Sequence, residues 1–571
     1  MTAIRSLVAA SAVLVLVCCG APQPAPTPQP TPSAPIPVGS LFATSDSCAA
    51  CHNGLTAPKG EDISVGTDWR PTMMANSARD PYWHASVTRE VRLHPPARAV
   101  IEDACASCHM PMSRYEAKSG GRTGEVFANL PIGESAAPAA HLAADGTSCT
   151  VCHQITADKL GTRESFSGGF TVQIAQQQGS RRAFGPFPVD NDHVLLMRAA
   201  SGYEPVEAAH FRQSEVCATC HMLITTTLGP DSKPIGELPE QVPYLEWRHS
   251  AYPATQSCLT CHMPAVDAAV AISSVLGVAR SGVRRHEFLG GNVLMPRILD
   301  RFRQELGVVA LPQELDASLQ RQTRYLQSQA AAVTIAGARL DGRRLQVDVV
   351  VENRAGHKLP SAYPSRRAWL HVTVRDARGR IVFESGAVRP DGSIQGNDND
   401  ADASRYEPHY TEIDAADKVQ IYESVMTDPA GAVTTVLLSG VRYVKDNRLL
   451  PRGFDKATAD KDIAVLGAAE TDADFTGGQD TVRYSADVAD SPGPFRVQGE
   501  LLYQPIGYRW AQNLRAEKSP EADRFVSYYE ALASSSWVRL ARGETTVPSR
   551  TGAEELGNSS DQAARPARRP F

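Results

Sequence analysis

The stretch Cys258-Leu259-Thr260-Cys261-His262 is one copy of a Cys-x-x-Cys-His pattern that occurs five times in this chain of 571 residues, at 48–52, 105–109, 149–153, 217–221 and 258–262. Two thiols three positions apart lie on one tight turn, where they can add to the two vinyl groups of a single porphyrin. The histidine that follows can then bind the iron. The pattern therefore predicts five covalently attached c-type haems. The attaching thiols are those of Cys48, Cys51, Cys105, Cys108, Cys149, Cys152, Cys217, Cys220, Cys258 and Cys261, and the first iron ligands are His52, His109, His153, His221 and His262.

Neither chance nor zinc binding accounts well for five copies of this pattern. At this composition chance would produce it roughly 0.01 times, against the five copies present. Zinc ribbons pair two Cys-x-x-Cys knuckles and do not need a histidine directly after each one. Ten of the twelve cysteines belong to the motifs, and the remaining two are Cys18 and Cys19. No thiol is left for a disulfide or a nucleophile, which suits a protein that matures outside the cytoplasm.

The first twenty residues are typical of a signal segment. Arg5 precedes an apolar run at 7–17 that is too short to span a bilayer. Leu16-Val17-Cys18-Cys19 resembles a bacterial lipobox with Cys19 as the lipidated residue, and ordinary signal-peptide cleavage without a lipid is the alternative. The Pro-rich stretch at 21–38 predicts an extended spacer. We therefore expect an exported protein in the periplasm or at the outer membrane or cell surface, held to the membrane by a lipid anchor.

The rest of the chain predicts an α+β protein with two folded domains. A mainly helical and loop-rich haem domain is expected at 40–330, closed by a helix at 313–330 with Leu315, Leu319 and Leu326 on one face. From 331 to 547, alternating stretches such as 345–351 and 370–374 predict an antiparallel β-sandwich, immunoglobulin-like in type. Further strands are expected at 381–383, 433–438, 482–485 and 495–503, a helix at 522–533, and a disordered polar tail at 548–571.

The second ligand of each iron decides what a haem can do. A second histidine gives a closed electron-transfer haem, and an open position gives a place for chemistry. We expect second ligands among His84, His141, His210, His249 and His286. Met73 and Met74 are alternatives to His84, because a thioether also binds iron. Since His249 lies only nine residues before Cys258, we expect it to bind the iron of a different motif.

The remaining histidines are assigned differently. His94 and His193 are expected in solvent, as is His371 on a strand face. His357 lies in a glycine-flanked loop that leaves a strand, from which it could reach a haem of the neighbouring domain as a ligand or contact residue. Met110, Met222 and Met263 are expected to pack at haem edges.

An acidic loop offers a second type of site. Asp398, Asp400 and Asp402 alternate with other residues, and Glu407 follows. Carboxylates in a loop suit calcium, although the spacing is not that of an EF-hand. A solvated acidic turn is the alternative.

These residues resemble the bacterial multihaem cytochrome c group that includes cytochrome c-554-like tetrahaem proteins, nitrite reductase and hydroxylamine oxidoreductase. The resemblance covers 40–290 and rests on Cys-His-Met-Pro after two motifs, on upstream Trp-plus-His segments, and on His286 before Gly-Gly-Asn. The β-rich C-terminal domain of such families resembles two later stretches of this chain, GHKLPSAYPSRRAWLHVTVRD at 356–376 and YVKDNRLLPRGF at 443–454. The chain departs from both enzymes: it lacks the Cys-x-x-Cys-Lys motif of common nitrite reductases and has too few haem motifs for hydroxylamine oxidoreductase.

Two functions follow as hypotheses. The first is an electron carrier in which five haems relay electrons to redox partner proteins. The second is a reductase or oxidase of a small nitrogen or sulfur compound at one open haem, with Lys358, Arg366 and Arg367 as groups beside it. The net charge of −6 argues against a nucleic-acid partner.

Overall fold

The computed structural model describes residues 40–172 and 181–549. The predicted signal segment, the spacer, Cys19 and nearly all of the predicted tail lie outside this part and stay predictions. All described residues belong to one compact unit. The domain boundary predicted between 330 and 331 also stays a prediction. We call 40–330 the haem region and 331–549 the β region.

Each of the five motifs closes a short helix. Residues three and four apart share one face of a helix, so Cys-x-x-Cys-His places both thiols and the imidazole on the same face. The histidine is the last residue of four of these helices and directly follows the other one. The motif helices are α1 (Ser45–His52), α4 (Arg98–His109), α7 (Cys149–Cys152), α9 (Glu215–His221) and α11 (Cys258–His262).

Helix α3 (Pro81–Leu93) of the haem region begins at a clear local signal. The side chain of Asp80 accepts hydrogen bonds from the amides of Tyr82 and Trp83, and Pro81 takes the first helical position. In the described part of the chain, no helix is both long and apolar enough for a membrane crossing. The remaining helices are α2 (Val65–Trp69), α5 (Pro111–Ser119), α6 (Pro138–Ala144), α8 (Asn191–Ser201), α10 (Pro243–Arg248), α12 (Leu294–Arg301) and α13 (Pro312–Tyr325).

Strands in the haem region form two small sheets. β1 (Arg181–Gly185) pairs in parallel with β2 (Tyr203–Glu207). β3 (Leu223–Leu228) pairs antiparallel with β4 (Pro234–Gln241) directly after the fourth motif. The predicted closing helix is observed as α13, which continues into one π-helical turn at Leu326–Ala330 before the first long strand.

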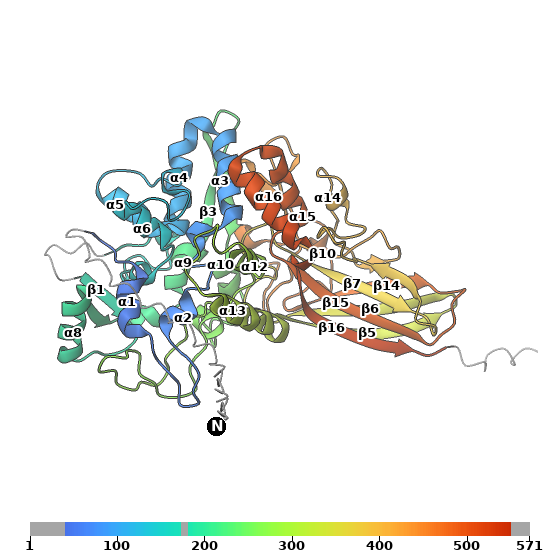
Figure 1. The fold of residues 1–571 in the computed structure, drawn as a ribbon. Helices are drawn as coiled ribbons and strands as arrows, with labels where there is room; N and C mark the ends of the chain where they lie inside the picture. Colours follow the sequence, from blue (N-terminus) through green and yellow to red (C-terminus); the bar gives the residue numbers. More distant parts are fainter. Residues whose placement is uncertain (1–39, 173–180, 550–571) are drawn as a thin grey trace, which may run out of the picture. The chain divides into compact units, whose positions relative to one another are not determined.

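The β region is built on two main sheets (Figure 1). One has the order β5-β6-β14-β9, and the other has the order β10-β7-β15-β16 with β8 added to β7. Most pairs are antiparallel, and β14 with β9 is parallel. The strands are β5 (Ala331–Asp341), β6 (Arg344–Asn353), β7 (Arg367–Arg375), β8 (Ile381–Ser385), β9 (Glu412–Ile413), β10 (Ile421–Tyr422), β14 (Gln479–Asp487), β15 (Phe495–Gln504) and β16 (Val538–Val547).

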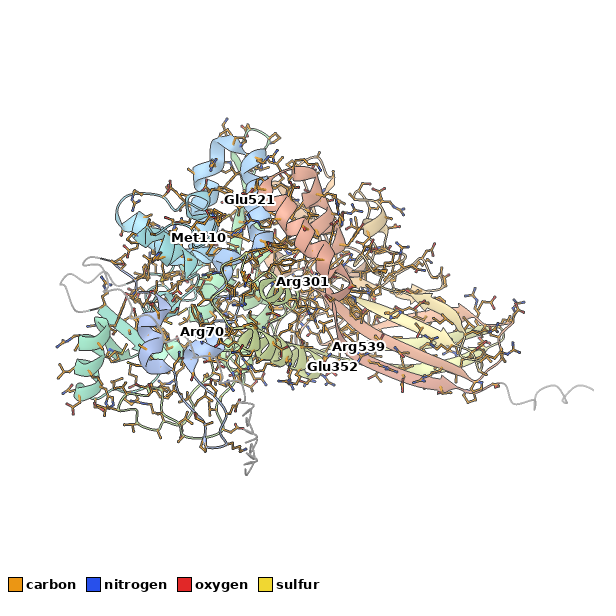
Figure 2. All side chains as sticks on the ribbon, in the orientation of Figure 1. Arg70, Met110, Arg301, Glu352, Glu521 and Arg539 are labelled. Carbon is orange, nitrogen blue, oxygen red and sulfur yellow. The ribbon has the colours of Figure 1, made fainter. Side chains whose placement is uncertain are left out.

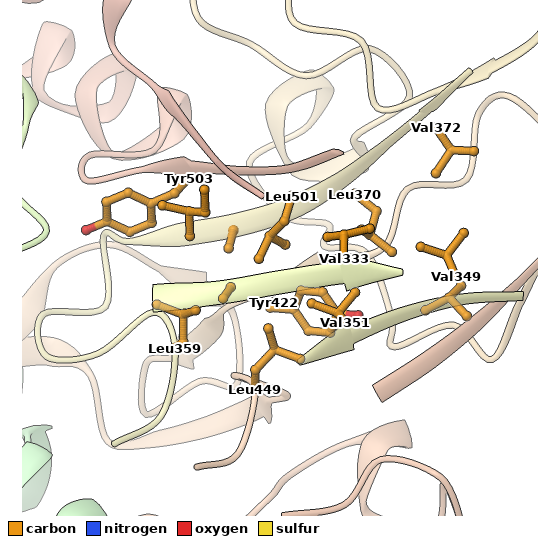
Figure 3. Close-up of a cluster of buried hydrophobic side chains, with 14 of the residues drawn as sticks. Val333, Val349, Val351, Leu359, Leu370, Val372, Tyr422, Leu449, Leu501 and Tyr503 are labelled. Carbon is orange, nitrogen blue, oxygen red and sulfur yellow. The ribbon is translucent and has the colours of Figure 1, made fainter. Parts of the chain in front are cut away.

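The inner faces of these sheets share one hydrophobic core. Buried residues alternate along β6, as the sequence pattern predicts for a half-buried strand. Figure 3 shows Val349 and Val351 of β6 with Leu370 and Val372 of β7 in this cluster. A two-sheet sandwich is therefore observed, whereas its immunoglobulin-like type stays a prediction.

One predicted strand is much shorter than expected. Of 433–438, only Val433–Thr434 forms a strand, β12, which pairs with β11 (Ser424–Thr427) beside β13 (Arg442–Asp446). The amide of Leu437 instead donates to the carboxylate of Glu90 in α3, at 2.8 Å, and Leu438 donates to the same carboxylate. A distant glutamate takes the hydrogen bonds that a neighbouring strand would otherwise accept.

Helix α3 is also covered by the end of the chain. The C-terminal helices are α15 (Tyr508–Leu514) and α16 (Pro520–Leu532), the latter matching the helix predicted at 522–533. The ring of Tyr82 in α3 lies 5.0 Å from that of Phe525 in α16, and both belong to one buried cluster. Residues more than 400 positions apart therefore complete a common core.

Candidate haem-binding site

Four of the five motif histidines are oriented by a backbone carbonyl. Nδ1 of His109 donates to Ser77 at 2.9 Å, and Nδ1 of His153 donates to Phe184 at 2.6 Å. His52 and His262 make the same contact with the carbonyls of Ile272 and Leu289. A carbonyl can only accept, so each proton lies on Nδ1 and Nε2 keeps its lone pair. This is the arrangement that holds a metal-binding imidazole in place.

The structure brings the motifs together in space. Helix α1 of the first motif contacts α7 of the third, and Cys220 of the fourth packs on the buried cluster that contains Val151 of the third. The amide of Cys258 donates to Ser214 at the start of α9, at 3.1 Å. The amide of Gly168 donates to the carbonyl of Thr219 at 2.7 Å, and a Cβ on Gly168 would lie 3.0 Å from the hydroxyl of Ser107. All ten motif cysteines are free and partly exposed, so each can reach a haem edge.

Two pairs of histidines have the separation that an iron between them requires. The ring centres of His153 and His286 are 6.4 Å apart, and those of His262 and His357 are 6.3 Å apart. Metal–imidazole bonds are about 2.0–2.1 Å long and a ring nitrogen lies about 1.1 Å from the ring centre, so two imidazoles on opposite sides of one metal have centres about 6.3 Å apart. The residues present therefore fit a haem iron at both places.

Burial keeps these imidazoles in the neutral form that binds metal. It lowers the pKa of His262 to about 4 and that of His286 to about 3. Nδ1 of His286 is also buried without a hydrogen-bond partner among the described residues. An unpaired polar atom in a buried site is costly unless a ligand or metal satisfies it.

Three other predicted second ligands bond through Nε2 to carbonyls. The acceptors are Ala78 for His84 at 2.8 Å, Ile155 for His210 at 2.9 Å and Asp455 for His249 at 2.9 Å. In these rings only Nδ1 keeps a lone pair. His141 is an exposed residue of α6. The roles of these four histidines as ligands stay predictions.

Of the histidines expected in solvent, His94 is instead buried. It is only 4% exposed, because the turn at Leu437–Ser439 from the β region covers it. His193 is partly exposed and contacts the carboxylate of Asp190 at 2.8 Å. His371 pairs with Glu384 on the sheet surface at 2.9 Å.

The methionines after the motifs differ in burial. Met110 and Met222 are buried and Met263 is partly exposed. Met110 joins α4 to α5 (Figure 2) and belongs to the same cluster as Trp83, whose ring stacks on His109 at 4.3 Å. No pattern in the sequence signals this stacking or the carbonyls that orient the motif histidines.

The acidic loop does not gather its carboxylates. Asp400 forms a buried ion pair with Arg367 at 2.7 Å, Asp398 pairs with Arg405, and Asp402 caps Ser404. Each carboxylate therefore has a protein partner, and calcium binding stays a prediction.

A different buried group, His409, Asp472 and Asp480, has the composition of a metal site. The hydrogen bonds of His409 are already satisfied without a metal ion. Nδ1 of His409 accepts from the amides of Gln420 at 2.8 Å and Asn447 at 3.1 Å, so the proton lies on Nε2 and is donated to Asp472 at 2.9 Å. A metal on Nε2 would require a proton on Nδ1, where both neighbours are donors.

Comparisons with known proteins give one weak likeness. No protein-family model and no curated protein sequence matches the chain. Among solved structures, it is similar to a penta-heme cytochrome c552 from Thermochromatium tepidum, with 16% identity, a TM-score of 0.48, and coverage of 89% of this chain and 99% of that chain. A likeness at this level does not establish a common fold or function, so the haem assignment rests on the motifs and their geometry.

Proposed function

We propose that the protein is a multihaem c-type cytochrome that relays electrons through five covalently bound haems. The observation that carries this proposal is the proximity of motifs far apart in sequence. The first motif contacts the third through α1 and α7, and the third and fourth share a buried cluster. The fifth is bonded to Ser214 at the start of the fourth motif's helix, and Gly168 lies between the second and the fourth. Haems attached at these thiols would lie edge to edge, as a relay needs.

The proposal includes finer statements that the sequence suggests. The haem region is related to the cytochrome c-554-like group, and the β region is an immunoglobulin-like sandwich that docks a redox partner protein or positions the assembly. Calcium is left out, because Asp398, Asp400 and Asp402 each have a partner of their own. The protein acts in the periplasm or at the outer surface, anchored through Cys19.

Two contacts speak against the alternative of an open catalytic haem. Of the three basic residues that could line such a haem, Lys358 is buried against Asp446 at 2.8 Å and Arg367 is buried against Asp400. A buried cation held by a carboxylate is not free to bind a substrate. Arg366 donates to the carbonyl of Ser361 at 2.9 Å.

Protein matured with the cytochrome c machinery is expected to carry five covalent haems. The chain has five Cys-x-x-Cys-His motifs, so intact-mass spectrometry should show five haem additions. Electron paramagnetic resonance of the oxidised protein should show low-spin iron only, as closed electron-transfer haems require. Four or fewer haems would refute the proposal, and a high-spin signal would revive the reductase alternative.

The anchor is tested separately. Cys19→Ser is expected to move the protein from the membrane fraction to the soluble fraction, because the lipidated thiol is removed. Cys18→Ser is the matched control and should leave the protein in the membrane fraction. Wild-type protein that is already soluble after export would contradict the lipid anchor without affecting the haem assignment.

A further inference from the structure

We propose that the haem attached at Cys258 and Cys261 takes its second iron ligand, His357, from the β region. This inference rests on the proposed function, since it presumes haem at the fifth motif. His357 lies in the loop that follows β6, 95 positions after His262. The haem is thereby held from both regions of the chain.

The nitrogen atoms of both rings are suited to a shared iron. Nδ1 of His357 donates to the carbonyl of Lys358 at 3.0 Å, and Nδ1 of His262 donates to Leu289. Each ring therefore keeps the lone pair of Nε2 for metal. The planes are nearly parallel, at 7°, and the ring centres are 6.3 Å apart, which is too far for face-to-face contact and right for two axial ligands.

The loop around His357 is fixed from the β region. The side-chain amide of Asn353 donates to the carbonyls of His357 and Leu449, both at 2.9 Å. Leu359 and Leu449 exchange two backbone hydrogen bonds of 2.9 Å. These contacts fix the path of the loop from within the β region, so the ordering of the ligand adds little to the cost of binding.

The same loop is also fixed from the haem region. Glu246 of α10 is fully buried and accepts from the amide of Lys358 at 3.1 Å and from the hydroxyl of Ser361 at 3.2 Å. A Cβ on Gly356 would lie 3.4 Å from the ring of Trp247, so the backbone of the loop packs closely on α10. His357 is thus placed by both regions at once.

His249 is less suited to the same iron. Its Nε2 bonds to the carbonyl of Asp455 at 2.9 Å, and its ring lies 4.7 Å from that of Phe454 in edge-to-face contact. Both partners belong to the β region. His371 of β7 serves as the matched control, since it also belongs to the β region and its ring nitrogens face the carboxylates of Glu384 at 2.9 Å and Glu500 at 3.4 Å.

The test is carbon monoxide binding to the reduced holoprotein. His357→Ala should bind carbon monoxide at one iron more than wild type and show one high-spin haem, whereas His371→Ala should bind no more carbon monoxide than wild type. His357→Gly should return to the low-spin spectrum when imidazole is added, which a purely structural role would not produce. His357→Met should keep the haem low-spin and raise its midpoint potential, because thioether ligation favours ferrous iron.

The outcomes separate this inference from the proposed function. Five haems by mass with unchanged spectra, potentials and carbon monoxide binding in the His357 variants would overturn the inference alone. A haem count below five in wild type would count against the proposed function. If His357→Ala does not fold, the Met variant decides: absence of a His/Met charge-transfer band and of any shift in potential overturns the inference.

Discussion

Full-length protein made without covalent haem is expected to lose the structure of its haem region and to keep the strands of its β region. The two regions differ in the apolar core that their own side chains supply. The three clusters whose buried residues all belong to the haem region contain ten, six and four such residues. The β region has the large shared core of its two sheets. A segment without enough apolar burial cannot offset its conformational entropy.

The segment after the fifth motif is most dependent on haem. No helix or strand lies between α11 and α12, a described stretch in which Leu276 is 75% exposed and Val278 is 56% exposed. Hydrogen exchange of the haem-free chain should show near-unfolded rates across 40–292 and protection in β6, β7, β14 and β15. The holoprotein is the control. Equal protection of 40–292 with and without haem would contradict this expectation.

Asp446→Asn is expected to destabilise the protein by about 3–5 kcal/mol, the cost of breaking a buried ion pair from one side. Asp446 accepts from Lys358 at 2.8 Å and from Arg448 at 2.7 Å, and all three are buried. Arg448 also pairs with Glu246 at 2.9 Å. The substitution leaves two cations facing a single carboxylate.

Chemical denaturation of the holoprotein measures this loss. Glu352→Gln is the control, because Glu352, labelled in Figure 2, pairs at 3.0 Å with the exposed Arg354. Such surface pairs contribute about 0–1 kcal/mol. A loss below about 1 kcal/mol for Asp446→Asn would show that the network is not a structural support.

The ion pairs of Asp446 also predict that the stability of the protein depends on pH. Burial alone would raise the pKa of Asp446, but the charges of Arg448 and Lys358 outweigh it and lower the pKa to about 2. A lowered folded pKa gives stability that is complete above the ordinary value of 3.8 and is lost as the pH falls through about 2. The difference between wild type and Asp446→Asn should therefore shrink in this acid range.

The sequence was most informative where chemistry or periodicity is local. Alternation along 345–351 predicted β6, and Cys-x-x-Cys-His identified the thiols and first ligands. Prediction from the sequence failed where a residue's contact partner lies far away along the chain. His94 precedes two prolines and looks like a surface residue, yet a turn more than 340 positions later buries it.

The second ligands show the same limit. The motif spacing fixes one imidazole per haem, but the other is chosen by tertiary structure. The sequence favours His249, which follows Trp247 shortly before the fifth motif, over His357 in its glycine-flanked loop. In the structure a carbonyl occupies Nε2 of His249 and Nδ1 of His357. Such carbonyls carry no side-chain signal, so no pattern in the sequence could reveal this difference.

The packing of α3 against α16 has a consequence for biosynthesis. Chains are made from the amino terminus. The contact of Tyr82 with Phe525 and the hydrogen bond of Glu90 with Leu437 can therefore form only when nearly the whole polypeptide has been made. Native closure is therefore a late event, dominated by contacts that are distant in sequence and slow to form. We therefore expect thioether formation on the early motifs to precede this closure, so that the attached haems are enclosed when the C-terminal helices pack.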